Sequence, residues 1–172
     1  MFGRRNIAVL LLVGVSAFSA VGCQEGLPTG PTGPITVQLS SAPATLTAEP
    51  STGVTLLVAG VPVALDWKAS FAVVINLDLD SDPVAITSLN NAVRQAVAGV
   101  VVVPTPPDAE RYLFDQRVRG NRVEPGGEQV IEFDVWYTLP RGGPEAVVTT
   151  NITFTPDTGA AFVKTLDIPV AP

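Results

Sequence analysis

The feature that most constrains the fold of this chain is a succession of short β-branched runs that follows Pro34. Proline, glycine, asparagine and aspartate break these runs at intervals of roughly ten residues, as in proteins built from many short strands. Several runs alternate apolar with polar residues, which is the period of a strand that buries one face. Phe71 and every second residue as far as Leu79 are expected on one such face, as are Ile131, Phe133, Val135 and Tyr137.

This pattern predicts eleven strands and no long helix. They are expected at Thr36–Ser40, Thr45–Glu49, Val54–Val58, Val61–Trp67, Ala69–Leu79, Val84–Leu89, Val97–Val103, Arg111–Arg119, Gln129–Leu139, Val147–Thr155 and Ala161–Val170. Only Asn90–Ala98 is a candidate for a turn of helix, which Gly99 would end. Many short strands in one domain of this size predict an all-β sandwich or barrel.

Two segments near the C-terminus carry a resemblance to one of these architectures. In Val123–Phe133 a proline-glycine turn leads into an alternating strand, and Asp157-Thr158-Gly159 separates two further strand patterns. These segments resemble the immunoglobulin-like or fibronectin-III-like modules of bacterial envelope proteins, and they cover about the last third of the chain. The resemblance implies a single Ig-like antiparallel β-sandwich. Trp67 is not assigned the role of the core tryptophan of antibody domains, because the chain lacks a cysteine pair.

The N-terminus has the layout of an export signal. A basic start with Arg4 and Arg5 precedes an uncharged apolar stretch, Ile7–Phe18, and small residues lead to Cys23, the only cysteine. The apolar stretch is shorter than the roughly 18 residues expected of a membrane-spanning helix. A cysteine in this place resembles the lipobox of bacterial lipoproteins, whose thiol receives a diacylglycerol. The resemblance implies lipidation of Cys23 and removal of residues 1–22.

The sequence therefore predicts three parts. Residues 1–22 form the lipoprotein signal peptide, and residues 23–34 form the lipidated cysteine with a tether rich in proline and glycine. Such a tether is extended and solvated, and reaches on the order of 30 Å. Residues 35–172 form the sandwich.

Composition excludes several kinds of site. The chain has no histidine, which removes Ser-His-Asp and Cys-His catalysis and histidine-ligated metals. Two of the ten basic residues lie in the signal, so the mature chain carries eight basic and sixteen acidic side chains, formally −8. Nucleic acid is not an expected partner of so acidic a chain. We expect no cofactor and no catalytic residue.

Asp78, Asp80 and Asp82 are the candidate metal ligands. Residues two apart share one face of a strand, so three carboxylates could converge on Ca²⁺ at a strand end. Pro83 stands where the calcium loop of EF-hands has glycine. The interpretation that we prefer is a solvated strand face that runs into an Asp-Pro turn.

Four arginines form a second cluster: Arg111, Arg117, Arg119 and Arg122. Tyr112 and Phe114 lie between them. The cluster could contact lipid headgroups, lipopolysaccharide phosphates or an acidic partner. The alternative that we prefer is a strand whose outer arginines, Arg117 and Arg119, lie opposite acidic residues such as Glu132 or Asp134.

Carboxylate pairs offer a third possibility. Asp66 with Asp134, or Glu124 with Glu128, could form the acid and base of a hydrolase, although nothing in the sequence places either pair beside a cleft.

The functional hypothesis is a lipid-anchored protein of the bacterial cell envelope that acts as a non-catalytic binding or structural module. Its partners would be the membrane, through Cys23, and an envelope protein or polysaccharide. Gln24 follows Cys23, which implies the outer membrane if the source is Gram-negative. The alternatives are a calcium- or carbohydrate-binding module of the adhesin type and a hydrolase that uses carboxylates alone.

Overall fold

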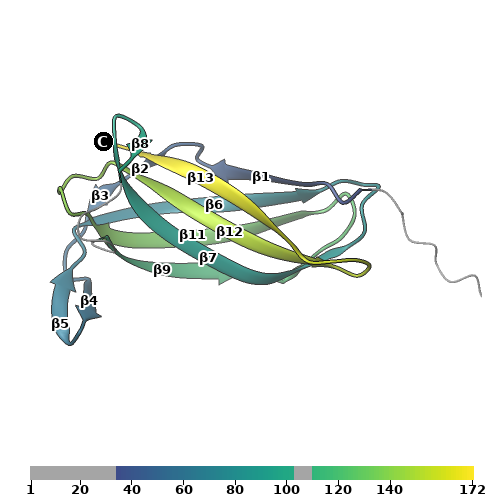
Figure 1. Cartoon of the computed structure of the whole chain (residues 1–172), viewed down its shortest axis with the longest axis horizontal. Coiled ribbons are helices and arrows are strands. Elements are labelled where there is room, and N and C mark those ends of the chain that lie inside the picture. Colours follow the sequence, from purple (N-terminus) through teal and green to yellow (C-terminus); the bar gives the residue numbers. More distant parts are fainter. Residues whose placement is uncertain (1–33, 103–109) are drawn as a thin grey trace, which may run out of the picture.

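The computed structural model describes residues 34–102 and 110–172, and these form an all-β sandwich of two sheets packed face to face (Figure 1). The first sheet has the order β1-β6-β11-β9, with the short β3 also paired to β6. Its strands are β1 (Val37–Ala42), β3 (Glu49–Pro50), β6 (Trp67–Leu77), β9 (Arg111–Val118) and β11 (Glu128–Thr138).

The second sheet has the order β10-β7-β12-β13-β2, with β8 also paired to β7. Its strands are β2 (Leu46–Thr47), β7 (Val84–Val97), β8 (Val100–Val101), β10 (Arg122–Val123), β12 (Ala146–Pro156) and β13 (Phe162–Ala171). A separate two-stranded sheet consists of β4 (Thr55–Val58) and β5 (Val61–Ala64).

The long strands are connected in the immunoglobulin-like order. Among the strands of six or more residues, the first, second, fifth and fourth form one sheet, and the third, sixth and seventh form the other. This is the arrangement of constant-type immunoglobulin domains. The expected Ig-like sandwich is therefore confirmed. One short pair differs from the antiparallel arrangement of the long strands, because β2 runs parallel to β13.

The core fills the space between the sheets. The alternation in β11 is confirmed, since Ile131, Phe133, Val135 and Tyr137 are all buried. In β6 the predicted face is buried from Phe71 to Leu77, but Leu79 is 71% exposed. The strand ends at Leu77 because the carboxylate of Asp78 accepts a hydrogen bond from the Leu79 amide, 2.8 Å away.

The predicted turn of helix at Asn90–Ala98 is wrong. Residues 90–97 belong to β7, which runs from Val84 to Val97, and Ala98 lies in the turn that follows. A register shift against β12 lies between Thr153 and Phe154, opposite Ile86 and Ser88. Such a bulge inserts one residue and moves the following side chains to the other face. The alternation of buried and exposed residues that begins at Val84 therefore changes phase after the bulge. As a result, the sequence of β7 shows no single strand period.

The β4–β5 hairpin projects from the body of the sandwich near one end of the long axis, and the described chain begins at the other end (Figure 1). Its base is fixed by two hydrogen bonds, from Leu65 N to Val54 O at 3.0 Å and from Ser51 N to Asp66 O at 2.7 Å. Leu65 itself is buried. The hairpin is thus a defined extension of the sandwich.

The predicted signal, Cys23 and the tether as far as Gly33 lie outside the described residues, so their assignment stays a prediction. Within residues 34–102 and 110–172, no helix is long and apolar enough to cross a membrane.

Candidate functional site

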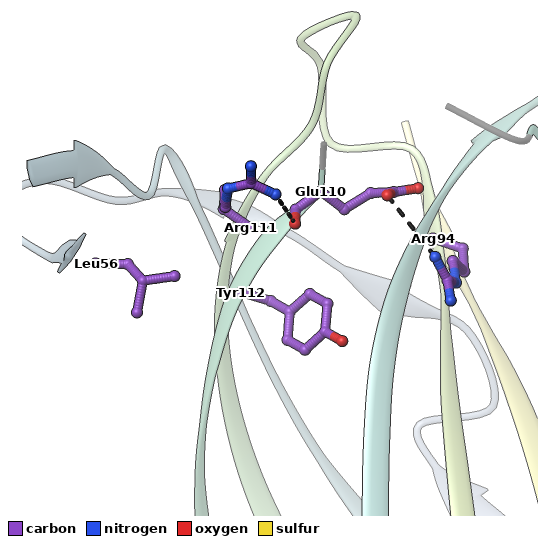
Figure 2. Close-up of a pocket in the computed structure, with 5 residues that line it drawn as sticks. All are labelled: Leu56, Arg94, Glu110, Arg111 and Tyr112. Carbon is purple, nitrogen blue, oxygen red and sulfur yellow. Dashed lines mark hydrogen bonds and ion pairs between the residues drawn. The ribbon is translucent and has the colours of Figure 1, made fainter. Parts of the chain in front are cut away.

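A pocket of about 290 Å³ lies between the two sheets and the hairpin, and it is lined by Leu56, Arg94, Glu110, Arg111 and Tyr112 (Figure 2). Leu56 comes from β4, and Arg94 comes from β7 of the second sheet. Arg111 and Tyr112 begin β9, the edge strand of the first sheet. Three separate elements therefore bring two guanidinium groups, a carboxylate, a phenol and an apolar wall to one place.

Glu110 is the unusual member of this group. Its side chain is only 2% exposed, and neither carboxylate oxygen accepts a hydrogen bond from another described residue. The nearest cation is Arg94, whose Nη1 lies 3.8 Å from Glu110 Oε2, beyond hydrogen-bonding distance. Arg111 donates instead to the backbone carbonyl of Glu110, at 3.0 Å. A buried carboxylate without hydrogen-bond donors is costly, and such groups are rare in folded proteins.

The sequence analysis identified two of the five residues that line this pocket. Arg111 and Tyr112 belong to the predicted arginine cluster, whereas Leu56, Arg94 and Glu110 were not singled out. Glu110 carried a signal, because it has the same parity in the chain as Tyr112 and Phe114 and so occupies an inward-facing register. Arg94 could not be placed, because the bulge in β7 changes which residues face the pocket.

The described lining of the pocket offers groups that can hold a polar ligand. Among these described residues, Glu110 supplies the one carboxylate, and none is a serine, cysteine or lysine. Hydrolysis of a glycosidic bond uses two carboxyl groups across the bond. The arginines and the tyrosine can instead orient a polar ligand, while Glu110 accepts hydrogen bonds from it.

The structure does not bring Asp78, Asp80 and Asp82 together as a metal site. Within the described ranges, no group of three acidic side chains could hold a metal ion. Asp78 and Asp80 are exposed, as expected of a solvated face. Asp82 contradicts that interpretation, because it is 7% exposed and accepts a hydrogen bond from the Thr158 hydroxyl. Its carboxylate ties the end of this segment to the turn between β12 and β13.

The four predicted arginines do not form one patch. Arg117 lies opposite Glu132 and pairs with Asp134 at 2.8 Å, which confirms the cross-strand interpretation for this residue. Arg119 has no ion-pair partner in the described part of the chain. Arg122 contacts both carboxylate oxygens of Asp157, at 2.8 and 2.6 Å. These hydrogen bonds hold the pKa of Asp157 below its usual range and raise the pKa of Arg122.

Three of the four candidate acid and base residues make structural contacts. Asp134 accepts a hydrogen bond from the Ser70 hydroxyl and also pairs with Lys68, so its pKa is lowered. Asp66 accepts a hydrogen bond from Thr138 at 2.6 Å, and Glu124 pairs with Arg122 at 2.7 Å. Glu128 is exposed at the start of β11. None of these four carboxylates lines the pocket of Glu110.

A comparison with protein-family models finds none that matches this chain, and a comparison with curated proteins finds no match either.

Proposed function

We propose that this chain is a lipid-anchored protein of the bacterial cell envelope whose sandwich is a non-catalytic binding module. The observation that carries the binding role is Glu110, a buried carboxylate without a hydrogen bond from another described residue, in a pocket lined by two arginines and a tyrosine. A ligand that donates hydrogen bonds would satisfy this group. The signal-like segment that ends at Cys23 supports the anchor.

The ligand class that fits the pocket best is a hydroxyl-rich carbohydrate. Vicinal hydroxyl groups can donate to a carboxylate while their oxygens accept from arginine. Tyr112 and Leu56 add apolar surface for the face of a sugar ring. This keeps the carbohydrate-binding alternative and sets aside calcium, since the described residues gather no cluster of carboxylates.

The anchor is tested by intact mass spectrometry of the protein from the membrane fraction. We expect a chain that begins at Cys23 and carries a diacylglycerol, and we expect Cys23→Ser to abolish processing at this position. A mature protein that begins elsewhere and stays soluble would contradict the anchor, whatever the pocket binds.

The pocket is tested on a glycan array and then by titration with any glycan retained. Glu110→Gln preserves the size of the side chain but removes the negative charge, and we expect the affinity to fall about tenfold or more, the equivalent of a charge-assisted hydrogen bond. Glu128→Gln, an exposed glutamate outside the pocket, is the matched control and should bind as the parent does. Glycan binding that is equal in all three proteins would exclude the pocket as the binding site.

A further inference from the structure

We propose that the β4–β5 hairpin inserts its tip into the outer part of a lipid bilayer. The segment from Val54 to Ala64 carries no charged residue, and Thr55 is its only polar side chain. Leu57 is 72% exposed and Val61 is 61% exposed. Exposed apolar surface on a projecting element marks an interaction site. The β7–β8 turn also exposes apolar residues, namely Val97, Val100 and Val101. The proposal rests on the lipid anchor of the proposed function only because the anchor brings the hairpin to a membrane.

Both faces of the hairpin are apolar. In the register of β4 and β5, Leu56 lies opposite Val63 and Val58 opposite Val61, which gives one face. The other face carries Leu57 opposite Pro62 and Thr55 opposite Ala64. A strand with one face in water would alternate apolar with polar residues, whereas a continuous apolar run is typical of strands with both faces covered. The sandwich covers only part of one face, where Leu56 meets the pocket.

The turn at the tip is apolar, although its backbone conformation is unfavourable for alanine. Ala59 and Gly60 have φ angles of 50° and 83°, the left-handed values that a two-residue hairpin turn requires at both positions. Asparagine, aspartate or glycine would adopt the first of these conformations with less strain. Alanine in this position removes the polar groups that a solvated turn usually carries.

The four residues at this tip occur a second time in the chain, so the two turns can be compared. Val58-Ala59-Gly60-Val61 recurs as Val97-Ala98-Gly99-Val100, which forms the turn between β7 and β8. There the carboxylate of Glu145 accepts a hydrogen bond from the Gly99 amide at 2.8 Å, so a charge lies at the turn. Among the described residues, no carboxylate forms a corresponding hydrogen bond with Ala59 or Gly60 at the β4–β5 tip, which suits this tip to lipid.

Pro62 favours lipid over a pairing strand from another protein. In a hairpin with a two-residue turn, the residues that flank the turn form a hydrogen-bonded pair, so the next pair directs its backbone groups outward. That next pair is Leu57 and Pro62. Proline has no N–H, which weakens this edge as a template for strand addition. It also removes one donor that would be unsatisfied in hydrocarbon.

The dimensions agree with insertion into one leaflet. The four residues of β4 extend about 13 Å, and half of a bilayer core is about 15 Å thick. Charged residues resume at the base, where Asp66 is held by Thr138. The charged base thus lies one strand length from the tip, at the depth of the headgroups.

The position of the hairpin fits a second point of attachment. The chain enters the sandwich at the end opposite the hairpin, and β4–β5 projects to one side of the long axis while the β7–β8 turn lies on the other (Figure 1). Between Cys23 and Pro34 the chain can extend roughly 35 Å. An anchor at one end and the hairpin at the other would hold the sandwich along the membrane surface.

The test places an environment-sensitive fluorophore at the tip of the mature lipoprotein, reconstituted in phosphatidylcholine vesicles. Lipidation occupies the only native thiol, so Val61→Cys supplies one labelling site. The matched control is Val100→Cys, at the same place in the second tetrapeptide and 67% exposed. With brominated lipids we expect about twofold or more greater quenching at position 61 than at position 100. Leu57→Asp should abolish the difference while the anchored fraction stays unchanged.

Equal quenching at the two positions, or none at position 61, would overturn the insertion. Shielding of position 61 that depends on protein concentration and not on brominated lipid would show contact between copies, and would also overturn it. Failure of the anchor is detected separately. The protein would then be found outside the vesicle fraction, and the fluorophore would also react with an unlipidated Cys23.

Discussion

Strand β11 and the β4–β5 hairpin use apolar residues in opposite ways. In β11 the inner residues Ile131 and Phe133 are buried, while Glu132 and Asp134 on the outer face form ion pairs with Arg117. The hairpin has apolar residues on both faces and leaves Leu57 exposed. The alternation in β11 is explained by the sandwich alone. We attribute the composition of the hairpin to surroundings outside the described sandwich.

The strongest test of this comparison is to truncate one side chain in each region. The ring of Phe133 is buried and stacks on Phe71 with centroids 4.9 Å apart. We expect Phe133→Ala to lower the free energy of unfolding in urea by about 3–5 kcal/mol, because the lost packing leaves a cavity. Leu57→Ala should change it by no more than about 0.5 kcal/mol. Similar losses in both variants would show that the hairpin stabilises the sandwich.

Glu110 extends the comparison to a buried residue for which we propose a role in binding rather than in stability. Its carboxylate is desolvated and lacks a donor within the described chain, so the charge opposes folding. We expect Glu110→Gln to raise the free energy of unfolding by about 1 kcal/mol even as ligand binding weakens. Glu132→Gln, at an exposed ion pair, should stay within about 0.5 kcal/mol of the parent. A clear loss of stability in Glu110→Gln would mean that the carboxylate is a structural group.

Asp134 gives an effect of similar size at neutral pH, and this effect becomes smaller in acid. Its pKa is lowered from 3.8, chiefly by the hydrogen bond from Ser70 and also by Lys68. A carboxyl whose pKa is lower in the folded state stabilises the fold above its unfolded pKa, and this contribution is lost as the pH falls through the folded pKa. We expect Asp134→Asn to cost about 1 kcal/mol at neutral pH. In acid below pH 3.8 the difference should shrink, and a difference that does not change with pH would contradict the assignment.

The sequence predicted the sandwich because the alternation of apolar and polar residues is visible within each strand. The prediction was wrong where the structure depends on how one strand pairs with another. Phe71 to Leu77 and the inner face of β11 alternate plainly, and their burial was predicted. The bulge in β7 depends on how β7 pairs with β12. The sequence around these positions therefore did not predict that Gln95 is buried or that Arg94 lines the pocket. The pocket joins three elements, and only its contribution from β9 was contained in one predicted cluster.

The most direct test of the central claim is hydrogen exchange of the lipidated mature protein, with and without a bilayer. Detergent-free nanodiscs supply the membrane. The reference is the same lipidated protein kept in solution by a peptide, without a lipid bilayer. We predict that exchange across residues 54–64 slows about tenfold or more only with lipid, while exchange in β11 stays the same. Equal exchange of the hairpin in both states would contradict insertion and leave its apolar faces without the environment that we assign to them.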